Sequence, residues 1–176
     1  MNKTREEMTQ WVQSVVKTQE IQCEVEHEEN RDIIRMGFRL NNAISIVNVV
    51  IVAEDEFFQS YGFIDNNAGK RKAEVSEFLM RASASDSGHF ALDFENGQIS
   101  YEFRSPYRAY ETDEDLAVVW WLPVARFEDF GDALLKVILG CATPKEAFEE
   151  CISQSKVQEG ESENVEEGNK VLKDFA

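Results

Sequence analysis

The sequence predicts an α+β fold in which an antiparallel sheet is flanked by helices. Apolar residues follow helical spacing at both ends of the chain and alternate as in strands between them. The predicted strands are joined by short turns, which allow only antiparallel pairing between neighbours. With 176 residues, of which 43% are hydrophobic and 11% aromatic, the chain can bury one core without a disulfide or a metal.

The first helix is expected to begin at Thr4 and to end near Gln19. Thr4 and Glu7 have the spacing of a capping box, in which each side chain binds the backbone N–H of the other residue. The apolar residues that follow are three or four positions apart and therefore share one helix face. They are Met8, Trp11, Val12, Val15 and Val16.

Four strands are expected after this helix. The first two alternate apolar and polar residues, as strands with one buried face do. The third is apolar on both faces and rich in β-branched residues, so we predict that it is central in the sheet. The expected strands are residues 21–26, 34–40, 44–52 and 57–64.

A second helix over about residues 75–82 leads to a predicted β-hairpin. Asn96-Gly97 favours a two-residue type I′ turn, because that turn needs positive φ at both of its central residues. The strands on either side of the turn are expected to share one apolar face. Its members are Phe90, Leu92, Phe94, Ile99, Tyr101 and Phe103.

Three helices are expected after the hairpin. Thr112 can cap the first, and Leu122-Pro123 should end it, because proline inside a helix removes a backbone hydrogen bond. A second helix continues to Gly140, a residue type that often follows a helix. Thr143-Pro144 then supplies a cap and a first-turn proline for the third.

The composition changes beyond residue 153. Residues 154–176 hold three lysines, six acidic residues and few apolar ones, so their net charge is 3 − 6 = −3. Such a segment buries too little apolar surface to offset the entropy of ordering it. We therefore predict a single domain over residues 1–153 and an acidic, solvated tail over residues 154–176.

The charge of the chain argues against several classes of partner. Lysine and arginine number 18 against 34 acidic residues, which gives a net charge of −16 and a field that repels nucleic acids and anionic membranes. There is no signal-peptide pattern and no apolar run long enough to span a bilayer. Three cysteines without C-x-x-C spacing indicate reduced thiols. We expect a soluble cytoplasmic protein that binds neither nucleic acid nor membrane.

The sequence contains no recognisable metal, cofactor or catalytic motif. Cys23 and His27 share a strand face, but four strand residues separate them by about 13 Å, which is too far for one ion. The nine glycines form no phosphate-binding pattern. Ser87 near His89 lacks the context of a catalytic serine, and Cys141 is more typical of packing than of reactivity. We predict a protein that is not an enzyme and has no metal or cofactor.

Two alternative functions stay open. The first is an enzyme whose site is assembled from scattered carboxylates, which would require a pocket with convergent polar groups and a strongly shifted pKa. The second is an acidic mimic or inhibitor that occupies the basic groove of another protein, which would require carboxylates spaced like phosphates.

Aromatic residues are the main candidates for an interface. Phe57-Phe58 and Trp120-Trp121 are adjacent pairs, and neighbours on a helix, or on a strand covered on one side, cannot both face one core. Tyrosine and tryptophan are also enriched at protein interfaces. Either part of this surface is exposed or covered by another subunit, or both faces are covered within the domain. The candidate interface residues are Phe57, Tyr107, Tyr110 and Trp121.

Several short motifs lie between residues 78 and 147. They are Phe78-Leu79, Gly88-x-Phe90-x-Leu92-Asp93, Gly97-x-Ile99-x-Tyr101, Gly140 and Pro144-x-x-Ala147. In this order they resemble the YbjN family of sensory transduction regulators, whose fold is similar to that of type III secretion chaperones. The sequence departs from that fold's order of α-β-β-β-α-β-β-α by a fourth early strand and by Leu122-Pro123 in the late helix.

The resemblance implies a regulatory or chaperone-like role in which the chain binds a protein partner or client, often as a homodimer. It supplies no catalytic residues. Together with the missing motifs, it favours a non-enzymatic protein-binding regulator or chaperone-like adaptor.

Overall fold

A computed structural model describes residues 3–84 and 87–153. The strands and helices follow one another along the chain, and residues 144–153 form a further helix. In order, the elements are α1 (Arg5–Thr18), β1 (Cys23–His27), β2 (Asp32–Arg39), β3 (Ile46–Ala53), β4 (Phe57–Asn67), α2 (Lys72–Ala82), β5 (His89–Leu92), β6 (Gln98–Pro106), the 3-10 helix η1 (Tyr107–Ala109) and α3 (Asp113–Leu139).

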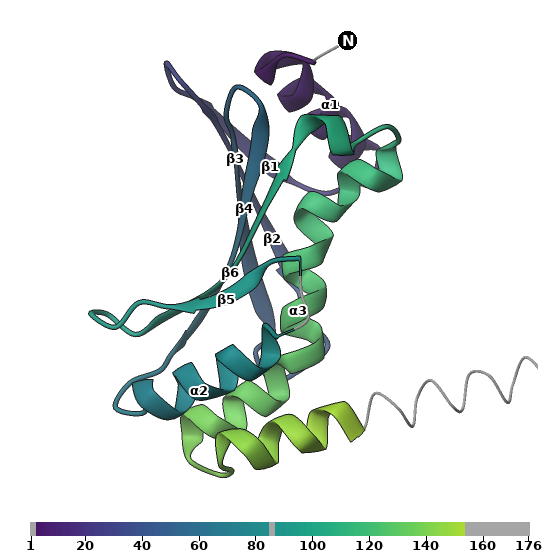
Figure 1. Cartoon of the computed structure of the whole chain (residues 1–176). Helices are drawn as coiled ribbons and strands as arrows, with labels where there is room; N and C mark the ends of the chain where they lie inside the picture. The colour runs from purple at the N-terminus through teal and green to yellow at the C-terminus, as the bar shows by residue number, and fades with distance from the viewer. Residues whose placement is uncertain (1–2, 85–86, 154–176) are drawn as a thin grey trace, which may run out of the picture.

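The strands form one six-stranded sheet in the order β1-β2-β3-β4-β6-β5, and every pair of neighbours is antiparallel. The helices α1 and α3 lie along the same side of this sheet, while α2 and the last helix lie at one of its ends (Figure 1). The predicted α+β fold, with an antiparallel sheet flanked by helices, is confirmed. The four strands predicted before α2 are also confirmed, and so is the prediction that the third of them lies inside the sheet rather than at its edge. The predicted tail, residues 154–176, lies outside the described residues.

One face of the sheet forms the core. On β2 to β4 every second residue is buried beneath the helices, as the two-residue period of a strand requires. The rows run straight across the sheet: Ile34 pairs with Ile51, and Ile51 with Ser60. We call this side the covered face. Its apolar members on β2 to β4 are Ile34, Met36, Phe38, Val47, Val49, Ile51, Ala53, Phe58 and Ile64.

The first helix is tied to the covered face by a buried carboxylate. The capping box predicted for Thr4 and Glu7 is present with both of its hydrogen bonds. One turn further on, the Thr9 hydroxyl donates to Asp32 Oδ2 at 2.8 Å, and His27 Nδ1 lies 2.9 Å from Asp32 Oδ1. Asp32 is only 3% exposed, so these bonds satisfy a charge that would otherwise be costly to bury.

The predicted break at Leu122-Pro123 is wrong. α3 runs without interruption for 27 residues, with Pro123 inside it and Gly140 in the left-handed conformation just beyond its end. Pro123 is buried against Gly62 of β4, where an added Cβ would lie 2.8 Å from the Pro123 Cβ. Burial of one long helix face on the sheet offsets the cost of the proline, about 3 kcal/mol. Sequence spacing alone does not show this packing.

The predicted two-residue turn at Asn96-Gly97 is also wrong. The strands pair Phe90 with Tyr101 and Leu92 with Ile99, so the hairpin closes through a longer loop. Only Gly97 has positive φ there, and the Asp93 carboxylate accepts from the backbone N–H groups of residues 95 and 96. The register differs by two residues from the predicted one and therefore keeps the predicted face. Phe94 is the exception, because it lies in the loop and is 60% exposed.

Candidate functional site

The opposite face of the sheet carries apolar side chains. No helix within residues 3–84 and 87–153 lies over it (Figure 1). These side chains come from the strand positions between those of the covered face, and most are half-buried. Exposed charged residues such as Arg35 and Arg39 flank them. We call this side the open face. Its apolar members on β2 to β4 are Ile33, Ile46, Val50, Val52, Phe57, Tyr61 and Phe63.

Two aromatic rings lie at the middle of the open face. Tyr61 and Phe63 stack with ring centroids 5.9 Å apart and planes inclined by 14°. Tyr61 pairs with Val50 on one side and with Glu102 on the other. Burial, and then the negative charge of Glu102, raise the pKa of Tyr61, so its hydroxyl stays protonated at neutral pH. The result is an apolar and aromatic strip with charged residues at its margins.

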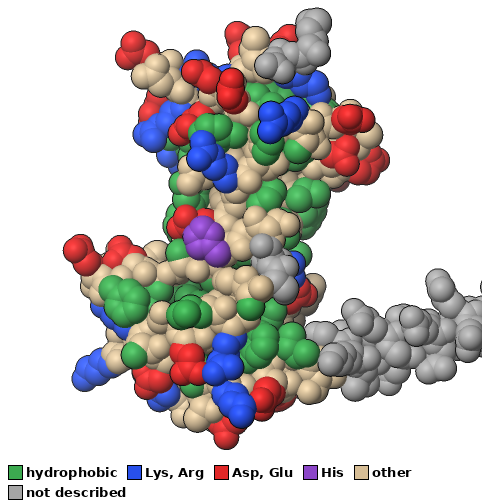
Figure 2. All heavy atoms as spheres, in the orientation of Figure 1, with side chains coloured by type: hydrophobic (Ala, Val, Ile, Leu, Met, Phe, Trp, Pro, Cys, Tyr) green, Lys and Arg blue, Asp and Glu red, His purple; other side chains and the backbone are tan. Residues whose placement is uncertain are grey.

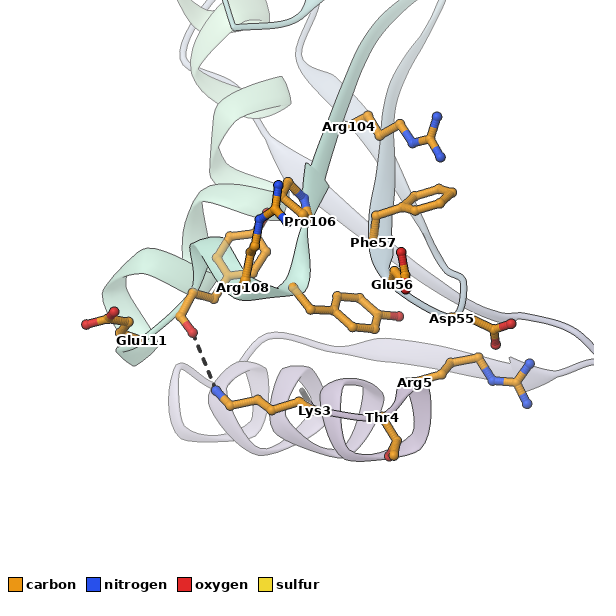
Figure 3. Close-up of a pocket in the computed structure, with 12 residues that line it drawn as sticks. Lys3, Thr4, Arg5, Asp55, Glu56, Phe57, Arg104, Pro106, Arg108 and Glu111 are labelled. Carbon is orange, nitrogen blue, oxygen red and sulfur yellow. Dashed lines mark hydrogen bonds between the residues drawn. The ribbon is translucent and has the colours of Figure 1, made fainter. Parts of the chain in front are cut away.

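The open face ends in a cleft of about 1000 Å³, which we call the terminal cleft. Three parts of the chain form it: the start of α1, the turn between β3 and β4, and the corner where β6 enters η1 (Figure 3). Hydrophobic side chains and Lys or Arg side chains are visible side by side at the end of the molecule where α1 lies (Figure 2). The lining residues are Lys3, Thr4, Arg5, Asp55, Glu56, Phe57, Arg104, Pro106, Tyr107, Arg108, Tyr110 and Glu111.

Two buried tyrosines line the inner side of the terminal cleft. Tyr107 and Tyr110 are each 5% exposed and pack on Phe58, with ring centroids 4.8 and 5.8 Å from it. The Tyr107 hydroxyl donates to the Glu54 carbonyl, which ties η1 to the β3–β4 turn. Burial raises the pKa of Tyr107, and it raises the pKa of Tyr110 to about 12. Both hydroxyls are therefore neutral and act in packing rather than in proton transfer.

Cations surround the mouth of the terminal cleft. The Arg104 guanidinium lies 3.4 Å from the centroid of the Phe57 ring. The Lys3 ammonium lies 3.4 Å from the centroid of the Trp11 ring and 3.5 Å from the Tyr110 carbonyl oxygen, to which it donates. Arg5 Nε is 3.9 Å from Asp32. Lys3, Arg5 and Arg104, which line this cleft, come from segments about a hundred residues apart in the sequence (Figure 3).

A second cleft of about 540 Å³ lies beside the first. It is lined by Asn30, Arg31 and Glu54 and shares the residues from Asp55 to Phe57 with the terminal cleft. Asp55, Glu56 and Phe57 border both clefts. The Phe57 side chain can therefore contact a peptide bound in either cleft.

The structure brings three of the four predicted interface residues together. Phe57, Tyr107 and Tyr110 all line the terminal cleft, although both tyrosines are buried within the domain. Trp121 lies apart from them on α3, where it is 44% exposed and packs 5.0 Å from the Phe38 ring. In each adjacent pair one ring enters the core, as at Phe58 and Trp120, and its neighbour stays partly exposed.

The cations of this site are not among the residues predicted from the sequence. Lys3, Arg5, Arg104 and Arg108 are spread over more than a hundred residues, and only the fold brings them to one cleft. The β6 sequence contains one indication of them. Glu102, Arg104 and Pro106 alternate with apolar or small residues, which places these three on the sheet face away from the core. The one run of consecutive basic residues, Lys70-Arg71-Lys72, lies outside this cleft, and there Lys72 Nζ donates to the Phe94 carbonyl at 2.6 Å.

The group nearest to a catalytic arrangement is the one around Asp32. Burial raises the pKa of this carboxylate, but the hydrogen bonds from His27 and Thr9 and the charges of His27 and Arg5 outweigh it, so the pKa is lowered. The Thr9 hydroxyl donates to the carboxylate and is 1% exposed, so His27 does not activate it and no substrate reaches it. Within residues 3–84 and 87–153, no three His, Cys, Asp or Glu residues are placed to hold a metal ion.

The chain matches no protein-family model and no curated protein. Membership of the YbjN family therefore stays a prediction that the motifs alone carry. In the part of the chain that the structure describes, none of the helices has the length and hydrophobicity needed to cross a bilayer.

Proposed function

We propose that this protein is a non-enzymatic binding module, a regulator or chaperone-like adaptor, that holds a segment of another protein against its open face. The observation that carries the proposal is the difference between the two sides of the sheet. The helices cover one side, while the other presents the aromatic pair of Tyr61 and Phe63 among aliphatic and charged residues. Apolar patches of this kind, rimmed by polar residues, are typical of protein-binding sites.

The charge pattern supports binding rather than mimicry of a nucleic acid. Across one row of the open face, Glu24 pairs with Arg35, Arg35 with Val50, and Tyr61 with Glu102. Both signs of charge flank the apolar strip, and the Arg35 guanidinium lies 2.9 Å from Glu26. A mimic would instead need a regular series of unpaired carboxylates. The resemblance to regulators and secretion chaperones is in accord with the same proposal.

The test is a selection of peptides from a random library on the wild-type chain. Selected peptides are then measured against the double variant Tyr61→Thr/Phe63→Thr, which removes both rings and keeps residues suited to strands. The control variant Met80→Thr/Phe94→Ser removes two side chains that are 73% and 60% exposed at other places. We expect the first variant to lose at least tenfold in affinity and the control to lose nothing. Equal affinity for wild type and both variants would contradict the proposal.

The homodimer also remains a proposal. Trp121 and Val118 are 44% and 43% exposed on α3, away from the open face, and offer an apolar surface for self-association. Light scattering at micromolar concentration should give about twice the mass of one 20.2 kDa chain, and Trp121→Glu should return it to the mass of one. A wild-type monomer across that range would remove the dimer and leave the open face unaffected.

A further inference from the structure

The terminal cleft contains cations that have no acidic partner, although the chain carries an excess of 16 negative charges. Elsewhere among the described residues, some basic side chains, such as Lys17 and Lys70, have no carboxylate within ion-pair distance, and several others are paired with one. Examples are Arg31 with Glu28, Arg81 with Glu77 and Lys136 with Glu150, at 2.6 to 2.7 Å. What distinguishes the cleft is that three such cations, Lys3, Arg104 and Arg108, line it together, with no carboxylate within ion-pair distance among residues 3–84 and 87–153.

We propose that the terminal cleft binds an acidic segment of a protein partner, with its carboxylates on Lys3, Arg104 and Arg108 and an apolar side chain against Phe57. This proposal rests on the proposed function and names the chemistry of the bound segment. Arginine presents a planar fork of donors that fits a carboxylate, and a cleft concentrates the field of the charges that line it.

The fold holds these cations in place before any partner binds. Arg104 is stacked on Phe57, which fixes the plane of the guanidinium and leaves the donors at its edge free. Arg108 follows Tyr107, whose buried ring and hydrogen bond to the Glu54 carbonyl fix the backbone of η1. Lys3 lies over Trp11, whose indole N–H donates to Asp113 of α3 at 2.6 Å. Such preorganisation lowers the entropy lost on binding.

The acidic residues of the cleft limit what it accepts. Asp55, Glu56 and Glu111 also line the cleft, so the four cations there are opposed by three carboxylates. A dense polyanion such as a nucleic acid would meet these carboxylates and the negative field of the whole chain. A peptide with a few carboxylates next to an apolar residue satisfies the cations and uses the exposed part of the Phe57 ring. The cleft therefore favours short acidic and apolar sequences.

The experiment measures fluorescence anisotropy of a labelled peptide that carries two glutamates beside a phenylalanine. Three protein forms are compared: the wild type, Arg104→Glu/Arg108→Glu, and the control Lys17→Glu/Lys70→Glu. Both variants change the net charge equally, and Lys17 and Lys70 are exposed at sites away from the cleft. We expect about tenfold weaker binding to the cleft variant, no more than twofold loss in the control, and weaker binding of the wild type at high salt.

Binding of two further ligands to the wild type can overturn the proposal. A peptide with glutamines in place of the glutamates should bind about tenfold more weakly to the wild type, and equal binding would contradict the role of the cations. A single-stranded DNA that binds more tightly than the acidic peptide would also contradict it. If library peptides bind the open face but are indifferent to Arg104→Glu/Arg108→Glu, this inference fails and the proposed function stands. If no library peptide binds the wild type, the proposed function itself fails.

Discussion

The covered and open faces of the sheet are built from the same strands, and neighbouring residues often belong to different faces. On β3, Ile51 points toward the helices and is fully buried, while Val52 points the other way and is half-buried. Both are apolar and β-branched, and both suit a strand. Their difference lies in what covers them, because α1 and α3 pack on one side of the sheet only (Figure 1).

This comparison separates stability from binding. A buried side chain on the covered face contributes the free energy of leaving water and of close packing in the core. An apolar side chain on the open face gains less on folding and keeps surface that a partner can bury. Substitutions on the first face should therefore lower stability, whereas substitutions on the second should lower affinity.

The largest expected effect comes from Ile51→Ala. Removal of a fully buried isoleucine leaves a cavity between β3 and the helices and should lower the free energy of unfolding by about 3 kcal/mol. The matched change Val52→Ala on the open face should cost less than about 1 kcal/mol. Urea denaturation of the two variants measures both values. Equal losses would show that the two faces are covered alike.

Asp32→Ala should lower the free energy of unfolding by about 2 kcal/mol. It removes the acceptor of the Thr9 hydroxyl and the partner of His27, and it leaves a buried donor unsatisfied. The control is Glu26→Ala, which lies on the other face of β1 in an exposed ion pair with Arg35 and should cost a few tenths of a kcal/mol. A loss as small as that of the control would contradict the role of Asp32 in anchoring α1.

The same carboxylate gives stability a dependence on pH. Because the pKa of Asp32 is lowered in the folded state, its contribution is complete above the ordinary Asp pKa. It is lost as the pH falls through the lower pKa of the folded protein. Thermal melts between pH 6 and pH 2 should fall more steeply for the wild type than for Asp32→Asn. Parallel curves would show that another group controls acid unfolding.

A smaller difference, about 1 kcal/mol between two variants, is expected for two loop glycines that belong to neither face, Gly97 between β5 and β6 and Gly69 between β4 and α2. At Gly97, with φ of 79°, an added Cβ would lie 2.4 Å from Asn67 Oδ1. At Gly69, with φ of 55°, nothing lies within 4 Å. Both Gly→Ala changes cost about 1 kcal/mol of backbone strain, and Gly97→Ala should cost about 1 kcal/mol more because Asn67 must move. Equal losses at the two glycines would mean that the contact with Asn67 is not rigid.

The smallest effect on stability is expected for Tyr61→Thr/Phe63→Thr. The rings are only half-buried on the open face, and threonine suits a strand, so the midpoint of urea denaturation should change little. The same variant should lose at least tenfold in affinity for selected peptides. A large loss of stability would show that the aromatic pair belongs to the folding core rather than to a binding surface.

Much of the fold could be predicted from the sequence, because it depends on local patterns. The alternation in β1 to β4, the capping box at Thr4 and the left-handed Gly140 are properties of short segments. The continuity of α3 through Pro123 could not be predicted, because the compensation comes from Gly62, about sixty residues earlier. The turn at Gly97 was missed for a related reason, since the Asp93 side chain, and not the Asn-Gly pair alone, sets its shape.

The candidate site was predictable only in part. The rule that adjacent aromatic residues cannot share one core correctly separated Phe57 from Phe58 and Trp121 from Trp120. It did not show that Tyr107 and Tyr110 would be buried together beneath the same cleft as Phe57. Nor could it place cations from both ends of the domain at one cleft, because that proximity follows from the topology of the sheet.

The central claim is that the open face, and not the helical side, is the binding surface. Its most direct test is an NMR titration of the isotope-labelled chain with a library-selected peptide. The chemical shifts of the backbone amides are measured at each peptide concentration. We predict that the largest shifts fall on β3, β4 and β6, around Val52, Tyr61 and Arg104. Shifts confined to α3 around Trp121, with the open face unchanged, would contradict the account.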